Sequence, residues 1–116
     1  MGLSVELFMQ DDYGDWTHVE CLYTSMIGPS RQLITNTMNS LFNENMPEGF
    51  VWGQVCYNYG GDECYLTETS NNNVTKISFN VLKTVWKISL NEELELDKEN
   101  EDIIDNNTIV CLATGN

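Results

Sequence analysis

His18 is the only histidine of the chain, and it stands between Trp16 and Glu20 on what we predict to be one face of a strand. Nucleophilic catalysis by a cysteine needs a histidine within reach of the thiol and an acid that orients the ring. His18 with Cys21 or Cys56 and an aspartate would supply these groups, but no local motif marks such a set. We therefore interpret His18 as an edge-strand residue and predict no catalytic residue.

Metal chemistry also has few ligands in this sequence. A single histidine cannot build a two- or three-histidine zinc site, and a structural zinc site takes close cysteine pairs of the type C-x₂₋₄-C. Cys56 and Cys64 are eight residues apart, and no D-x-[DN]-x-[DN]-G calcium loop occurs. We predict no metal and no cofactor. Because no secretory apolar region opens the chain, we expect Cys21, Cys56, Cys64 and Cys111 to be free thiols in a reducing cytoplasm.

The net charge limits the partners that the protein can bind. Five Lys or Arg stand against eighteen Asp or Glu in 116 residues, which is a formal net charge of −13. That length is one ordinary domain, so we predict a single acidic domain over residues 1–116. Direct binding to nucleic acid or to an anionic membrane needs Lys and Arg, which are scarce here. No run approaches the ~18 apolar residues of a membrane span. We expect a cytoplasmic protein that binds neither.

Most of the excess charge lies in one segment near the C-terminus. Residues 92–105 hold eight acids against Lys98 alone, which is −7 in fourteen residues. Leu94 and Leu96 alternate with acids as in a half-buried strand, so we predict that the carboxylates share one exposed face. Alternate strand residues lie about 6.6 Å apart, about twice the 3.4 Å phosphate rise of one DNA strand, so such a row would imitate a nucleic acid. The alternative is a solvated acidic loop that keeps the protein soluble.

The predicted partner-binding surface combines this segment with two smaller groups. Tyrosines beside acidic turns are typical anchors of protein–protein interfaces, and aspartates cluster in the first predicted turn. From the acidic segment the surface takes Glu92, Glu93, Glu95, Asp97, Glu99, Glu101, Asp102 and Asp105. From the two turns it takes Asp11, Asp12, Asp15, Tyr57, Tyr59, Asp62 and Glu63.

The strands are predicted from alternation and from turn chemistry. Residues 3–9 and 16–23 predict a hairpin around an acidic turn, and residues 50–59 and 64–68 predict a second one around Gly60. Residues 108–113 read as a final buried strand. With the helices below, this pattern predicts an α+β fold: an antiparallel sheet of about five or six strands with one or two helices packed on one face.

Two stretches have helical patterns. Ser30 is the predicted N-cap of a helix that ends at Asn43. The apolar face of this helix would carry Leu33, Ile34, Met38, Leu41 and Phe42. Residues 69–73 read as a loop. Residues 74–90 fit either strands or a helix, and we favour a helix over roughly 78–88 followed by a strand.

In size, charge and lack of catalytic motifs, the chain resembles the small acidic proteins that phages use against host defences, such as anti-CRISPR and anti-restriction proteins. The resemblance implies a non-catalytic inhibitor that covers the basic, nucleic-acid-binding surface of a nuclease or effector, in the host cytoplasm if phage-encoded. A bacterial immunity protein that neutralises a toxin would carry the same charge and is the alternative. A small enzyme using His18 with a Cys or a carboxylate comes third. We expect a monomer or a homodimer, since an exposed edge strand can pair two copies.

Overall fold

The computed structural model describes residues 3–26 and 28–115 and has an α+β fold, as predicted. The strands are β1 (Leu3–Gln10), β2 (Trp16–Met26), β3 (Gly53–Tyr57), β4 (Cys64–Leu66), β5 (Ile77–Ser78) and β6 (Ile109–Gly115). The helices are α1 (Gly28–Phe42), α2 (Glu68–Asn73), α3 (Phe79–Leu90) and α4 (Lys98–Glu101). The sheet follows the order β2-β1-β6-β3-β4, and β5 pairs with β6 beside this path.

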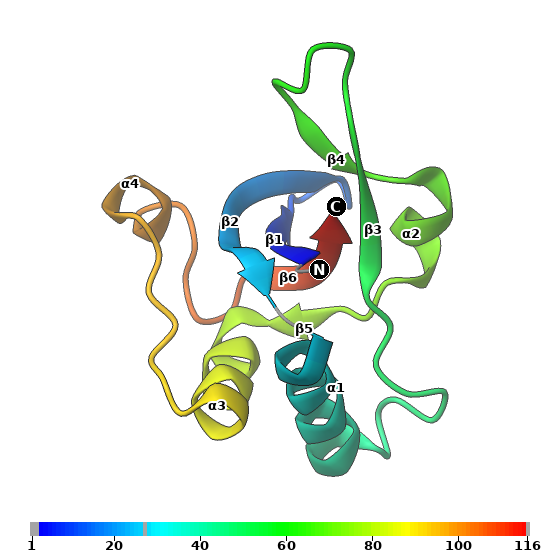
Figure 1. Ribbon diagram of the computed structural model, residues 1–116, viewed down its shortest axis with the longest axis vertical. Helices are drawn as coiled ribbons and strands as arrows, with labels where there is room; N and C mark the ends of the chain where they lie inside the picture. The colour runs from blue at the N-terminus through cyan, green and yellow to red at the C-terminus, as the bar shows by residue number, and fades with distance from the viewer. Residues whose placement is uncertain (1–2, 27, 116) are drawn as a thin grey trace.

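The sheet is mixed, so the prediction of an antiparallel sheet is wrong at one pairing. β1 pairs antiparallel with β2 and with β6, and β3 pairs antiparallel with β4. β3 and β6, however, run parallel. Parallel neighbours need a long crossover connection, and here the chain between them passes through α2, α3 and α4. The sheet also curls, which carries the β3–β4 hairpin round toward β2 (Figure 1).

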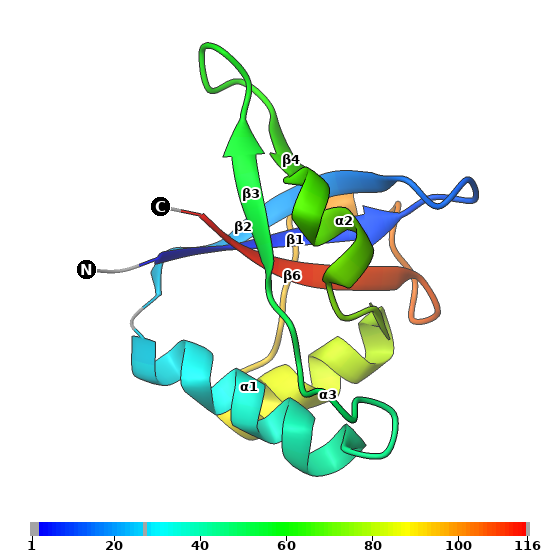
Figure 2. The same cartoon turned by 90° about the vertical axis from the view of Figure 1, so that its right-hand side faces the viewer.

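The prediction of one or two helices on one face is incomplete, because the described part of the chain forms four helices and α2 lies on the opposite side from α1 and α3. α1 and α3 lie side by side under one face, while α2 and the β3–β4 hairpin lie over the other (Figure 2). The larger core forms on the helix side, and it includes Val5, Leu7, Ile34, Met38, Leu82, Val85, Trp86, Val110 and Leu112. A smaller core fills the other side, with Phe8, Leu66, Val74, Cys111 and Ala113. Strands β1 and β6 are therefore buried on both faces.

α1 differs from the predicted helix in its start and in its buried face. It begins at Gly28, so Ser30 lies inside its first turn rather than at the N-cap. Ile34 and Met38 are fully buried, whereas Leu33 and Leu41 are about half exposed, at 49% and 48%. The buried stripe is narrower than predicted because α1 packs against α3 along one side only (Figure 2).

The other differences follow from where backbone groups find their hydrogen bonds. Residues 50–52 are not strand, since the amides of Phe50 and Val51 donate to the side chains of Asn39 and Thr75. Residues 69–73 are not a loop but belong to α2, whose N-cap is Thr67. The helix predicted over 78–88 is confirmed as α3, but no strand follows it in the described part of the chain before β6.

All four cysteines are free, as predicted. Cys111 is buried, Cys56 and Cys64 are partly buried, and Cys21 is exposed on β2. Within the residues that the structure describes, no helix is long and apolar enough to cross a membrane.

The neighbouring residues Ile34 and Leu33 provide a test of the α1 packing. Ile34→Ala removes a fully buried side chain and should lower the free energy of unfolding by about 2–5 kcal/mol. Leu33→Ala should cost less than about 1 kcal/mol, because half of that side chain is already in water. Urea unfolding of both variants measures the difference, and equal losses would contradict this packing.

Candidate functional site

The acidic segment between α3 and β6 is attached to the fold at three apolar points. Leu96 and Ile104 are buried in the larger core, and Leu94 packs against it. The predicted strand around Leu94 is wrong, because residues 91–97 pair with no other strand. The predicted alternation of exposure is nevertheless present, with Glu93 and Glu95 exposed on either side of Leu94. The segment is therefore folded onto the protein rather than being a free acidic loop.

Two acidic side chains hold this segment in place instead of facing solvent freely. Glu20 Oε1 on β2 accepts hydrogen bonds from the Asp97 amide and from Asn100 Nδ2, both at 2.9 Å. Glu92 accepts a hydrogen bond from the Tyr23 hydroxyl, and the Tyr23 ring stacks on Trp86 at 5.7 Å between centroids. Glu92, which we predicted to bind a partner, thus has a structural contact within the chain.

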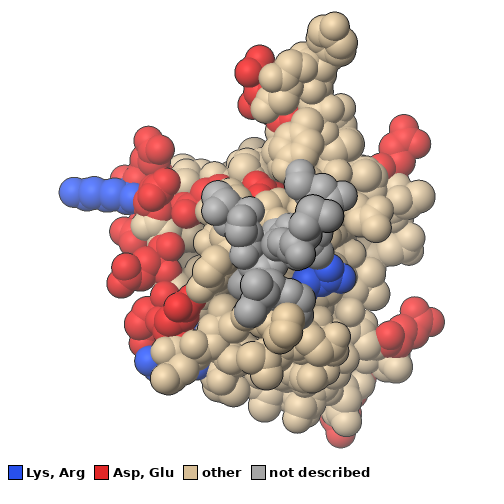
Figure 3. All heavy atoms as spheres, viewed as in Figure 1, with Lys and Arg blue, Asp and Glu red and all other residues tan. Residues whose placement is uncertain are grey.

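The remaining carboxylates form one exposed surface, which we call the acidic face. It consists of Glu93, Glu95, Asp97, Glu99, Glu101, Asp102 and Asp105. Figure 3 shows acidic side chains gathered on the side of the molecule where Figure 1 places α4 and the segment before it. Among the described residues, the one ion pair of the acidic face joins Lys87 Nζ to Glu93 Oε1 at 3.5 Å. Both partners are exposed, so this pair adds little stability, and the other six carboxylates have no ion-pair partner among the described residues.

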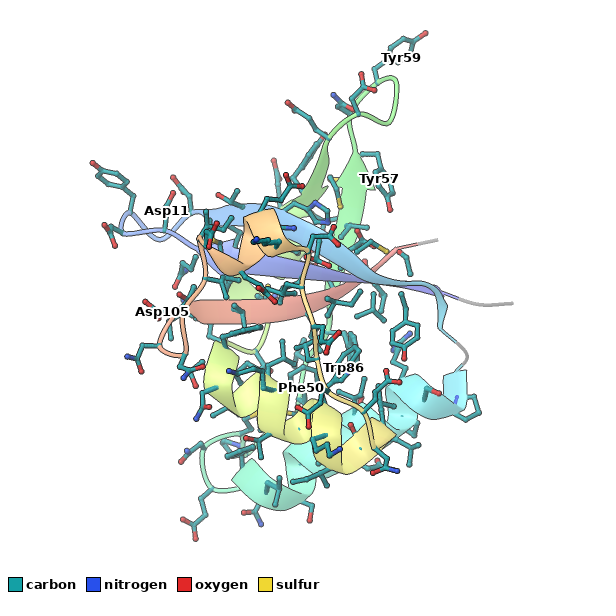
Figure 4. All side chains as sticks on the ribbon, turned by 90° about the vertical axis from the view of Figure 1, so that its left-hand side faces the viewer. Asp11, Phe50, Tyr57, Tyr59, Trp86 and Asp105 are labelled. Atoms are coloured by element: carbon teal, nitrogen blue, oxygen red, sulfur yellow. The ribbon has the colours of Figure 1, made fainter. Side chains whose placement is uncertain are left out.

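The first turn extends the acidic face. Met9 on β1 pairs with Val110 on β6, so the turn after β1 lies at the same end of the sheet as the loop before β6. Asp11 and Asp105 lie at this common end (Figure 4). The predicted grouping of Asp11, Asp12 and Asp15 with the acidic segment is therefore compatible with the fold.

The tyrosine-containing hairpin lies elsewhere. β3 runs parallel to β6, so its C-terminal end lies at the opposite end of the sheet from Asp105. Tyr59, at the hairpin tip, is fully exposed and lies far from Asp105 in Figure 4, and Tyr57 is about half exposed. The structure thus divides the predicted partner surface into two regions: the acidic face with the first turn, and the hairpin, which carries Tyr57, Tyr59, Asp62 and Glu63.

A bulge in β2 determines where His18 points. Leu7 of β1 pairs with Glu20, but the next residue, Phe8, pairs with His18, so β2 has one extra residue here. Directly opposed residues share a face of the sheet, which places Glu20 on the helix side and His18 on the other side. The prediction that His18 and Glu20 share a face is wrong for this reason.

On its side of the sheet, His18 meets a buried carboxylate. His18 Nε2 lies 2.8 Å from Oε1 of Glu6, whose side chain is almost completely buried. The edge of the His18 ring packs against Phe8 at 5.2 Å between centroids. Cys21, opposite Glu6 in the β1–β2 register, and Cys64 on β4 lie close by. The spacing of residues 6, 18 and 64 along the chain has no motif that would reveal this cluster.

The titration behaviour of the cluster follows from burial and from the shared carboxylate. Burial raises the pKa of Glu6, but the hydrogen bonds from His18 and Cys21 and the charge of His18 outweigh it, so the pKa is lowered. Burial, followed by the negative charge of Glu6, raises the pKa of Cys64 to about 11. Although Cys21 as a residue is exposed, the partial desolvation of its thiol and the hydrogen bond to Glu6 raise its pKa to about 12. Since the nucleophile is the thiolate, this environment does not activate either thiol.

Five cavities open on the described part of the chain. The largest of the five has a volume of about 610 Å³ and opens between the end of α1 and residues 73–77, where Met46 and Ile77 line it. None of the five cavities described here is lined by His18 or by a cysteine. The enzyme alternative needs a cleft where His18, a Cys and an acid converge; the residues converge, but at none of these five cavities.

Comparisons with protein-family models, with curated proteins and with solved structures found no match for this chain.

The attachment of the acidic segment can be tested at Leu96. Leu96→Ala removes a buried anchor and should lower the free energy of unfolding by about 2–5 kcal/mol. Amide hydrogen exchange should accelerate over residues 92–105 more than elsewhere, because the segment loses its packing. Ile103→Ala is the control, since Ile103 is about half exposed, and it should leave the exchange of this segment unchanged.

The contact between Tyr23 and Glu92 predicts a dependence of stability on pH. The hydrogen bond to Glu92 raises the pKa of Tyr23 from 10.0 to about 12. Because the folded pKa is the higher one, the neutral phenol stabilises the fold fully below the unfolded pKa, and this stabilisation is lost as pH rises from 10.0 to about 12. The free energy of unfolding of wild type should therefore exceed that of Tyr23→Phe at neutral pH by an amount that shrinks over this range. Urea unfolding of both proteins measures it, and a constant difference would count against the contact.

Proposed function

We propose that the protein is a non-catalytic binding protein whose acidic face covers a basic, nucleic-acid-binding surface of another protein. The observation that supports this most directly is the attachment of the acidic segment. Its apolar residues Leu94, Leu96 and Ile104 pack on the core, while the carboxylates between them are exposed. A solvated loop that served only solubility would not need these anchors.

The energetics of the acidic face favour a charged partner. Like charges held close together repel one another and destabilise the compact state unless counterions or a partner compensate them. A basic surface would relieve this repulsion on docking, and the net charge of −13 would accelerate the encounter. Because the segment is already folded, binding would not require ordering it first.

The shape of the acidic face supports charge complementarity rather than a copy of phosphate spacing. The carboxylates follow α4 and the irregular segment before it, so they do not form the strand row with its regular repeat that we predicted. The hairpin with Tyr59 lies apart from the acidic face and would contact the same partner only if that partner were large enough to reach both regions.

Either of two biological roles would use this surface in the cytoplasm. A phage-type inhibitor of host defence would bind a nuclease or nucleic-acid-binding effector of the host, and an immunity protein would bind a toxin. The identity of the captured protein separates them, because a toxin encoded beside the gene for this chain indicates immunity and a host defence effector indicates inhibition.

The test compares two variants that remove equal charge. Glu95, Glu99 and Glu101 are changed to Gln in the first variant, and Glu44, Glu48 and Glu68 are changed to Gln in the control. Wild type, variant and control serve in parallel as bait in nuclease-treated lysate. We expect wild type and control to retain the same basic protein and the acidic-face variant to lose it.

Binding to that protein is then measured across salt concentrations. The acidic-face variant should associate at least about tenfold more slowly at low salt and show a weaker salt dependence than the control. Equal rates and equal salt dependence for the two variants would refute the acidic face as the binding surface.

A further inference from the structure

Three strands bring three different metal-binding side chains together on the sheet face opposite α1 and α3. Glu6 comes from β1, His18 from β2 and Cys64 from β4. One carboxylate oxygen, one imidazole nitrogen and the thiol sulfur all lie within 4.8 Å of one another. Nothing in the proposed function uses this cluster, and it does not belong to the acidic face.

The cluster is built on well-ordered pairing rather than on flexible loops. The bulge in β2 turns His18 to the same face as Glu6 and Phe8, and Phe8 packs against the imidazole ring. β4 belongs to the hairpin that the curl of the sheet carries toward β2 (Figure 1). β2 and β4 are the two outermost strands of the path β2-β1-β6-β3-β4. The curl of the sheet brings these two strands together, so His18 on β2 lies close to Cys64 on β4.

The polar groups beside the cluster are buried, and one of them has no partner within the described part of the chain. Glu6 is 4% exposed, and isolated buried carboxylates are costly unless they are paired or coordinate a metal. The hydroxyl oxygen of Ser4, two residues along the same face of β1, is buried and has no hydrogen-bond partner among the described residues. A cation beside Glu6 would compensate the buried charge more completely than one imidazole does.

We propose that Glu6, His18 and Cys64 bind one Zn²⁺ ion. Carboxylate oxygen, imidazole nitrogen and thiolate sulfur are the ligands of zinc, at about 2.0–2.3 Å, and around a tetrahedral ion they lie roughly 3.3–3.7 Å apart. The Cys64 sulfur would therefore move closer to the other two donors, while His18 Nε2 and Glu6 Oε1, which are 2.8 Å apart, would separate slightly. The thiol proton of Cys64 leaves to solvent, and the ion replaces the hydrogen bond between His18 and Glu6. Water completes the tetrahedron. Cys21 also lies beside Glu6, but it does not belong to the three residues whose ligand atoms all lie within 4.8 Å of one another.

Zinc binding would connect β2 and β4, the two outermost strands of the sheet path. Zinc held by β1, β2 and β4 would fasten the β3–β4 hairpin to the β1–β2 pair, much as a cross-link does. The ion would then stabilise the native state by mass action, since the unfolded chain does not hold the three ligands together.

The experiment uses the full chain, reduced and stripped of metal, with CoCl₂ and ZnCl₂ as probes. Co²⁺ should bind at one ion per chain and show the near-ultraviolet charge-transfer absorption that a thiolate ligand causes. The carboxylates of the acidic face cannot cause this absorption. Zn²⁺ should displace the Co²⁺ and raise the Tm by at least about 5 °C at saturating concentration.

Matched cysteine variants separate this site from weak binding elsewhere. Cys64→Ser should abolish the charge-transfer absorption and weaken Zn²⁺ binding by more than about 100-fold, since changes beyond the ligands already cost 10–100-fold. Cys56→Ser, on the partner strand of the same hairpin, should bind as wild type does. Circular dichroism confirms that both variants fold, and His18→Gln provides a second loss of a ligand.

Two results would overturn the proposal. One is a reduced, folded wild-type protein that binds no stoichiometric Co²⁺ or Zn²⁺. The other is a folded Cys64→Ser variant that binds either metal as tightly, and with the same absorption, as Cys56→Ser does.

Discussion

The burial of β1 on both faces is the constraint on which the other elements depend. Val5 and Leu7 point into the core with α1 and α3, and Glu6 and Phe8 point the other way, yet all four are almost completely buried. A strand with two buried faces needs a layer on each side. The two helices supply one layer. The curl of the sheet supplies the other, because it folds β3, β4 and β2 around the second face. The carboxylate of Glu6 is buried as a consequence, and the β2 bulge is what brings His18 to it.

The order of the strands in the sheet also places the last strand, β6, beside the first, β1. β6 is the last strand in sequence but occupies the middle of the sheet between β1 and β3. Its side chains Val110 and Leu112 complete the larger core, and Cys111 and Ala113 complete the smaller one. The first and last strands must therefore pair before either core is complete. Contacts between residues so far apart in sequence raise the contact order of the fold, which is typical of slower folding.

Local patterns in the sequence predict the elements of this fold better than their arrangement. The first hairpin, α3 and the last strand follow from alternation, turn residues and helical spacing. The parallel pairing of β3 with β6 could not be predicted, because it depends on a connection that spans half the chain. The exposure of Leu33 depends on which side of α1 meets α3. The meeting of Glu6, His18 and Cys64 depends on a bulge and on the curl of the sheet, and neither has a signal in the spacing of these residues.

The acidic segment shows how a pattern can be right about exposure and wrong about secondary structure. Alternation of leucine and glutamate requires only that every second side chain reaches the core, and an irregular extended chain satisfies this as well as a strand does. The backbone amide of Asp97 donates to Glu20 instead of to a neighbouring strand. The carboxylate of Glu20 on β2 thus positions a segment whose own carboxylates repel one another. The apolar anchors at Leu96 and Ile104 hold these like charges in place, and the basic partner that we propose would compensate their repulsion.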